Sequence, residues 1–151
     1  MNMTQAVPSR EEAAAKGMVV AWHAAQAPDR MAVISQMGSR TFGELNDRAN
    51  RLVRALRRSG LETGDAVALL CSNRPEFIEV MVACQRGGFR ITPINWHLSG
   101  GEVGYIVENC EAKAFIADTR FAGSAREAAA MAPSLVTRFA VGGAIEGFDD
   151  Y

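Results

Sequence analysis

Residues 64–98 contain the pattern that most constrains the fold of this chain. Residues 66–70 form a short, continuous apolar run, AVALL, which is typical of a strand buried on both faces. Three residues then predict the start of a helix: Asn73 can cap it, Pro75 is tolerated in the first turn, and Glu76 occupies the capping-box position. This helix is apolar almost all round, which is typical of a helix that is buried.

Gly87 and Gly88 end the predicted helix, and residues 90–94 predict a second strand. Strand, helix and strand in direct succession form a βαβ unit, which implies a parallel sheet.

The same alternation continues towards the C-terminus. The further predicted elements are a helix over 101–109 with a capping box at Ser99 and Glu102, a strand over 113–117, a helix opened by Ser124 and Glu127, and a strand over 135–141. We therefore predict an α/β fold with an open, mostly parallel sheet and helices on both faces, a Rossmann-like subdomain.

A helix and a small hairpin are predicted before this unit. Residues 11–27 show helical spacing of apolar residues, and residues 32–35 and 40–42 flank a Gly-Ser turn. Residues 43–59 form the clearest amphipathic helix, and Thr41 with Glu44 provides its capping box. Five arginines follow the polar side of this helix, and we interpret them as a solvated face: Arg48, Arg51, Arg54, Arg57 and Arg58.

The length of 151 residues fits one domain, which we divide into a disordered segment 1–10, an α/β subdomain 11–141 and a loop or tail 142–151. A net charge of −1 gives no indication of a nucleic-acid or membrane-surface partner. No apolar run is long enough to span a membrane and no signal peptide is recognised, so a cytoplasmic location is expected.

Few residues indicate chemistry directly. The three cysteines, Cys71, Cys84 and Cys110, match no zinc or redox spacing and are expected to be buried thiols. His23 is interpreted as a surface or packing histidine. Asp118 follows a predicted parallel strand, where α/β folds place ligand contacts, although a turn or capping role is favoured.

The loop after residues 90–94 contains Asn95, Trp96 and His97, also at the carboxyl end of a strand. Either a role towards a ligand or a role in packing and turn formation fits these residues. The sequence contains no Gly-rich phosphate loop, metalloprotease motif or nucleophile elbow.

Several blocks, in order, resemble the beginning of the adenylate-forming superfamily of acyl-CoA synthetases and AMP-dependent ligases. They cover roughly residues 27–118 and read APDRMAVI, then RTFGELNDRANRLVRALRRSGLETGDAVALLCSNRPEFIEVMVACQRGGFRITPIN, then HLSGGEVGYIVENC. The sequence Asn95-Trp96-His97-Leu98 is most similar to fatty- and medium-chain acyl-CoA synthetases.

The resemblance implies a two-step ligase that uses ATP, Mg²⁺ and CoA. A carboxylate attacks the α-phosphate of ATP, which gives an acyl-adenylate and pyrophosphate, and the CoA thiol then displaces AMP. It also implies that the loop of Asn95, Trp96 and His97 lies near the CoA channel. Trp96 could stack on adenine or line the channel, and His97 could contact a phosphate or cap the turn.

The family's catalytic motifs, including the phosphate loop with its lysine, have no counterpart here, and Lys16 and Lys113 match none of them. The chain is therefore expected to resemble the first part of the large N-terminal domain, with the remainder of the ligase as its partner. It is expected to be inactive alone and to hold none of these cofactors tightly.

Two alternatives remain open at the sequence level. The first is a non-catalytic module that binds CoA or another protein, including a self-associating one. The second is a flavodoxin-like carrier, which is disfavoured because CSNRPE stands where a phosphate-binding loop would be.

Overall fold

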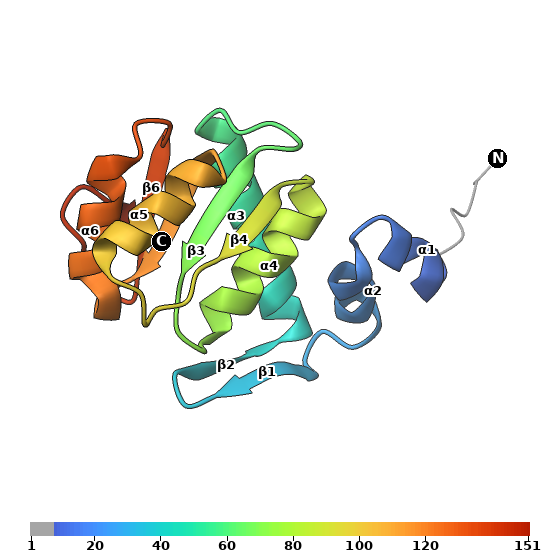
Figure 1. Cartoon of the computed structure of the whole chain (residues 1–151). Coiled ribbons are helices and arrows are strands. Elements are labelled where there is room, and N and C mark those ends of the chain that lie inside the picture. Colours follow the sequence, from blue (N-terminus) through green and yellow to red (C-terminus); the bar gives the residue numbers. More distant parts are fainter. Residues whose placement is uncertain (1–7) are drawn as a thin grey trace.

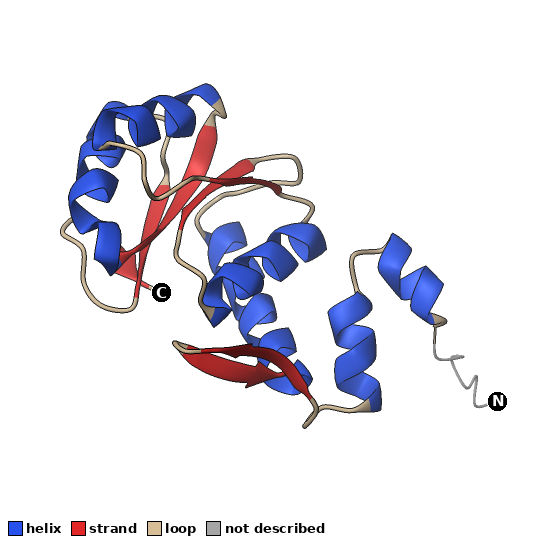
Figure 2. Cartoon of the chain, turned by 60° about the horizontal axis from the view of Figure 1, so that its bottom comes forward, coloured by secondary structure: helices blue, strands red, loops and turns tan. Residues whose placement is uncertain are grey.

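The computed structural model describes residues 8–151, which form a five-stranded sheet between two layers of helices, with a hairpin and two short helices beside it (Figures 1 and 2). The helices are α1 (Arg10–Ala15), α2 (Val19–Gln26), α3 (Phe42–Arg58), α4 (Pro75–Gly87), α5 (Gly100–Asn109), the 3-10 turn η1 (Thr119–Phe121) and α6 (Ala122–Met131). The strands are β1 (Met31–Ser35), β2 (Gly38–Thr41), β3 (Ala66–Leu70), β4 (Arg90–Pro93), β5 (Ala112–Asp118), β6 (Thr137–Val141) and β7 (Asp149–Asp150).

The large sheet has the strand order β4-β3-β5-β6-β7, and every neighbouring pair is parallel. Helices α3 and α4 pack on one face, and α5 and α6 pack on the other (Figure 2). The antiparallel pair β1–β2 forms the separate hairpin. The predicted fold class is therefore confirmed.

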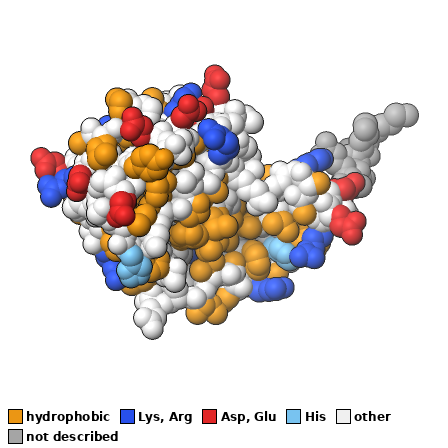
Figure 3. Space-filling model, viewed as in Figure 1, with side chains coloured by type: hydrophobic (Ala, Val, Ile, Leu, Met, Phe, Trp, Pro, Cys, Tyr) orange, Lys and Arg blue, Asp and Glu red, His pale blue; other side chains and the backbone are white. Residues whose placement is uncertain are grey.

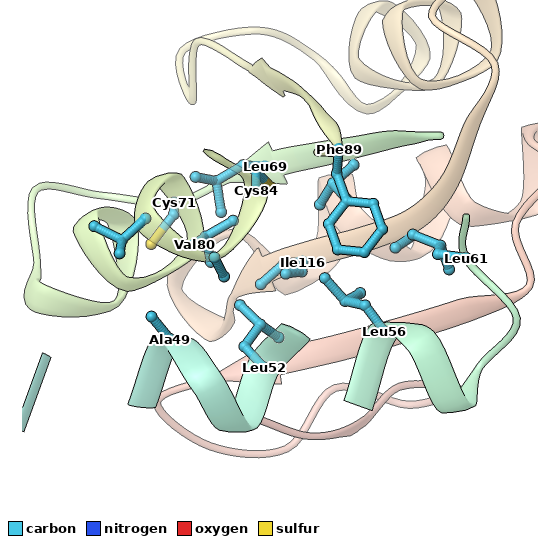
Figure 4. Packing of buried hydrophobic residues seen from close by; sticks show 14 of the residues in the cluster. Ala49, Leu52, Leu56, Leu61, Leu69, Cys71, Val80, Cys84, Phe89 and Ile116 are labelled. Atoms are coloured by element: carbon cyan, nitrogen blue, oxygen red, sulfur yellow. The ribbon is translucent and has the colours of Figure 1, made fainter. Parts of the chain in front are cut away.

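The central strand β3 supplies both cores because alternate side chains point to opposite faces of a sheet. Val67 and Leu69 pack towards α3 and α4, whereas Ala68 and Leu70 pack towards α5 and α6. Figure 4 shows Leu69 among the side chains of the α3–α4 core. Burial on both faces explains why this strand has no polar alternation in its sequence.

The chain reverses direction across the sheet after β4. From β3 it adds β4 on one side, and then returns over the opposite face to add β5 on the other side of β3. The crossovers α4 and α5 therefore lie on opposite faces. This creates a switch point between β3 and β5, and such points form a crevice at the carboxyl ends of the strands.

The single helix predicted over 11–27 is wrong, because the structure has two helices, α1 and α2. Gly17 separates them with φ +68°, and a Cβ there would lie 2.8 Å from the backbone oxygen of Gln85. Most of the predicted disorder over 1–10 falls on residues 1–7, which lie outside the described residues. Ser9, by contrast, caps α1 in a reciprocal capping box with Glu12.

The predicted capping boxes at Thr41 and Ser99 are confirmed, but two other predicted helix starts are wrong. Arg74, and not Asn73, is the N-cap of α4, and its side chain does not cap the helix. Ser124 lies inside α6, because Asp118 starts η1 and the chain continues from this turn into the helix.

The C-terminal segment 142–151 is not only a loop. Its residues 149–150 form β7 beside β6, and Ile145 is buried. The Tyr151 hydroxyl donates a hydrogen bond to Glu79 on α4, 3.0 Å away. The sequence of this segment has no periodic pattern that predicts a strand, because the segment is ordered by contacts with distant parts of the chain.

The solvated face predicted for α3 is confirmed, since all five of its arginines are exposed, and Arg57 makes additional contacts. The Arg57 guanidinium donates hydrogen bonds to the backbone oxygens of Leu61 and Gly87, and it lies 4.7 Å from the centre of the Phe89 ring. It therefore binds the loop after α3 and the carbonyl end of α4, where a cation is favourable.

Candidate functional site

The switch point between β3 and β5 holds a buried polar cluster. Ser72 follows β3, and its hydroxyl donates a 2.5 Å hydrogen bond to Oδ2 of Asp118, the last residue of β5. Oδ1 of Asp118 accepts the backbone N–H of Arg120 at 3.0 Å. Two strand ends and the η1 turn are therefore joined through one carboxylate.

Arg74 supplies the positive charge of this cluster. Its Nη1 lies 3.4 Å from Oδ1 of Asp118, and its Nε donates to Oε2 of Glu76 at 2.7 Å. Gly142, at the end of β6, lies against the guanidinium, since a Cβ there would be 2.5 Å from Nη1. The carboxyl ends of three strands thus meet around Arg74.

These contacts determine the ionisation of Asp118. Burial alone would raise its pKa, but the hydrogen bonds from Ser72 and from the Arg120 backbone, with the charge of Arg74, hold the pKa below its usual value. The neighbouring Cys71 behaves in the opposite way, because burial and then the charge of Asp118 raise its pKa to about 12. Asp118 is therefore ionised, and Cys71 is a poor nucleophile.

The loop of Asn95, Trp96 and His97 lies at the same edge of the sheet, after β4. The half-buried Trp96 stacks on Phe121 of η1, with ring centroids 6.0 Å apart and planes 9° apart. The His97 ring lies 5.6 Å from the Trp96 ring, and its backbone N–H donates to Oδ1 of Asn95 at 3.0 Å. Asn95 thus shapes the turn, while the side chain of His97 is exposed.

The structure places Arg120 beside this aromatic pair. Its guanidinium carbon lies 5.8 Å from the centre of the Phe121 ring, and the side chain is exposed. An aromatic surface next to an exposed cation and an imidazole can bind a ligand with a flat ring and a phosphate group. The sequence analysis predicted Trp96 and His97 for such a site but missed Phe121 and Arg120, since η1 was not predicted.

The other candidates have structural roles. His23 packs between Trp22 and Phe42, with ring centroids 4.9 and 4.8 Å away. Asp118 caps η1, as the favoured interpretation predicted. Cys71 and Cys84 are buried free thiols, whereas Cys110 is only half-buried. Lys113 pairs with Asp65 at 2.9 Å, at the amino ends of β5 and β3 and so at the opposite edge of the sheet from the cluster.

Sequence analysis missed a second buried cluster, around Glu79. This fully buried carboxylate pairs with Arg40 of β2 at 2.7 Å and accepts a hydrogen bond from Tyr151. Beside it, a hollow of about 180 Å³ lies between α3, β6 and the C-terminal segment. The sequence feature that could have revealed this cluster is a single acidic residue in an apolar helix, Glu79 between Ile78 and Val80.

Within residues 8–151 no group of three or more His, Cys, Asp or Glu side chains is arranged to hold a metal ion. The helices of this described part are also too short or too polar to cross a membrane.

Comparison with known proteins gives consistent matches. A family model described as AMP-binding enzyme matches residues 20–145. A medium/long-chain-fatty-acid–CoA/3-oxocholest-4-en-26-oate–CoA ligase of Mycolicibacterium smegmatis is 31% identical over 132 residues, which are 87% of this chain and 23% of that protein. A 2-succinylbenzoate–CoA ligase of Bacillus licheniformis is 39% identical over 94 residues, 62% of this chain and 20% of that protein.

Among solved structures, a fatty acyl CoA synthetase of Mycobacterium tuberculosis superposes with a TM-score of 0.75 and 26% identity. That match covers 83% of this chain and 26% of the other. The chain thus spans about a fifth of the length of the curated relatives it matches.

Proposed function

The chain belongs to the AMP-binding enzyme family, and we propose that it is the N-terminal portion of an ATP-dependent acyl-CoA synthetase. The parent enzyme would convert a carboxylate, ATP and CoA into acyl-CoA, AMP and pyrophosphate. A fatty or medium-chain acid is the proposed substrate, since one relative is named as a medium/long-chain-fatty-acid–CoA ligase. The remainder of the ligase would be the partner of this chain, in the cytoplasm.

The observation that carries the proposal is the surface formed by Trp96, Phe121, His97 and Arg120 at the carboxyl edge of the sheet. CoA combines an adenine ring with phosphate groups. Trp96 would offer its ring to the adenine, and Arg120 and His97 would contact phosphate oxygens. Asn95 would hold the turn that presents His97.

The described residues do not fit ATP and Mg²⁺ in the same way. The carboxylate at the switch point, Asp118, is fully buried, and both of its oxygens are already occupied by Ser72, Arg74 and the Arg120 backbone. Neither lysine lies in this cluster. The adenylation step would therefore depend on residues outside this chain, and the isolated chain is proposed to be inactive.

CoA binding can be tested through Trp96 fluorescence in a Trp22→Phe background, which leaves one tryptophan. We expect CoA to change the emission saturably and ATP to change it little. Arg120→Gln should weaken CoA binding about tenfold, the usual effect of removing one charge-assisted hydrogen bond. Arg126→Gln, an exposed arginine on α6 that pairs with Glu146, is the matched control and should leave the affinity unchanged.

A fluorescence signal that does not respond to CoA would refute the proposed site. Inactivity is tested separately, by ATP–pyrophosphate exchange with fatty acids of several lengths. Exchange above that of a heat-inactivated sample would refute the proposal that adenylation needs residues outside this chain.

A protein-interaction module is the second candidate, and an apolar surface favours it. The outer side of α4 was predicted to be buried, but Met81 is 43% exposed, and Ile78 lines two neighbouring hollows. Figure 3 shows hydrophobic side chains gathered at the centre of this face. The sheet edges are less suited to pairing, because β4 ends in Pro93 and β7 has only two acidic residues.

We therefore expect concentration-dependent self-association through the α4 surface, not through a sheet edge. Light scattering should show that Met81→Gln shifts the population towards the monomer. Tyr105→Gln, on the exposed side of α5, is the control and should have no such effect. A wild-type chain that stays monomeric at high concentration would contradict this candidate function.

A further inference from the structure

We propose that Asp118 is a positioning residue that holds the Trp96–Phe121 pair in place at the carboxyl edge of the sheet. The proposal deepens the CoA site proposed above and rests on it for its functional consequence. The positioning itself, however, can be measured without any ligand.

The first step of the argument is the distribution of contacts over the carboxylate. Oδ2 accepts from the Ser72 hydroxyl, which anchors Asp118 to the segment after β3. Oδ1 accepts from the backbone N–H of Arg120, which is the middle residue of η1. One oxygen therefore binds the sheet, and the other binds the turn that carries Phe121.

The second step is the rigidity of this link. Arg74 lies 3.4 Å from Oδ1, and its own guanidinium is held by Glu76 at 2.7 Å and faces Gly142. The side chain of Arg74 is 9% exposed, so this contact is poorly screened by water. Arg74 therefore adds a charged contact to the two hydrogen bonds by which Asp118 joins the segment after β3 to η1.

The third step is what η1 carries. Phe121 is its last residue, and its ring is the surface on which Trp96 stacks. Trp96 comes from a different loop, after the edge strand β4. The orientation of the pair therefore depends on η1 keeping its place.

Asp118 cannot itself contact a ligand, because it is fully buried and both oxygens are engaged. Its contribution must pass through η1. Replacement with Asn keeps the shape but removes the charge that Arg74 faces, and the amide has only one oxygen to accept the two hydrogen bonds.

The test uses the Trp22→Phe chain and NMR contacts between the Trp96 indole and the Phe121 ring. We expect Asp118→Asn to lose these contacts while the far-UV circular dichroism stays that of a folded chain. Phe121→Leu serves as the positive control for lost stacking. Glu108→Gln removes an exposed acid on α5 and should preserve every contact.

A folded Asp118→Asn chain that keeps the Trp96–Phe121 contacts would overturn the proposal. If Asp118→Asn does not fold, Ser72→Ala provides the second test, since it removes only the hydrogen bond to Oδ2. Weakened ring contacts in Ser72→Ala support the proposal, and fully retained contacts overturn it.

The functional consequence is tested by measuring CoA affinity in the same variants. We expect Asp118→Asn to bind CoA about tenfold more weakly, since a displaced aromatic anchor commonly costs that much. Unchanged CoA affinity together with lost ring contacts would overturn the functional part of the proposal. If the unmodified chain does not bind CoA but Asp118→Asn loses the ring contacts, the CoA site fails while the positioning role stands.

Discussion

Replacing Glu79 with Gln is expected to lower the free energy of unfolding by about 3–5 kcal/mol, the usual cost of removing one partner from a buried ion pair. Glu79 is fully buried on α4, and its Oε1 lies 2.7 Å from Nε of Arg40 and 3.7 Å from Nε of Arg48. The side chain of Arg40 is only 15% exposed, so it would remain as a poorly solvated charge. The neutral amide cannot compensate it.

The same substitution should loosen two distant segments. Arg40 belongs to β2, and Tyr151 follows β7, and the side chains of both bind the Glu79 carboxylate on α4. Burial and the nearby Glu79 raise the pKa of Tyr151, so its hydroxyl remains a donor. Faster amide hydrogen exchange is therefore expected in the hairpin and in β7.

Urea unfolding followed by circular dichroism measures the effect. Glu146→Gln is the matched control, because its pair with Arg126 is exposed on both sides and should contribute less than about 1 kcal/mol. Similar unfolding midpoints for the two variants would show that the Glu79 cluster does not stabilise the fold.

The second large effect is expected for Phe115→Ala, which should cost about 3–5 kcal/mol of unfolding free energy. Phe115 lies on β5, and its side chain is fully buried in the core between the sheet and helices α5 and α6. Its ring meets the Phe148 ring edge-on, with centroids 5.8 Å apart and planes at 61°. Truncation leaves a cavity between the sheet and these helices that rigid elements cannot close.

Val136→Ala controls for general effects of truncating an apolar side chain near the same strands. Val136 is 57% exposed, so its change should stay within about 0.5 kcal/mol. Because Phe148 lies in the C-terminal segment, Phe115→Ala should also weaken the protection of that segment. If Phe115→Ala lowered the free energy of unfolding by less than Val136→Ala does, the described packing would be contradicted.

Much of the fold could be predicted because its helices and strands are specified by interactions between residues close in the sequence. The strand at 66–70 and the helix of residues 43–59 follow from hydrophobic period alone, and the structure places both within a residue of their predicted bounds. The capping boxes at Thr41 and Ser99 were equally predictable, since each joins residues three positions apart. Such interactions need no knowledge of the rest of the chain.

The predictions were wrong where contacts with residues distant in the sequence determine the local structure. Gly17 breaks the N-terminal helix where its backbone passes close to Gln85, and the segment after Gly142 is ordered through β6 and Glu79. The candidate site shows the same division. Sequence position placed Trp96, His97 and Asp118 at strand ends, but only the folded chain brings Phe121 and Arg120 beside Trp96.

The sequence by itself thus determined the layered α/β architecture, because hydrophobic period and capping act over a few residues. It also indicated the edge of the sheet at which we propose that a ligand binds. The tertiary structure alone decided the partners of the buried charges. Arg40 and Glu79, and Arg74 and Asp118, are far apart in the chain and pair only after the strands and helices have packed. A buried charge requires such a partner, but nothing in its local sequence specifies which residue provides it.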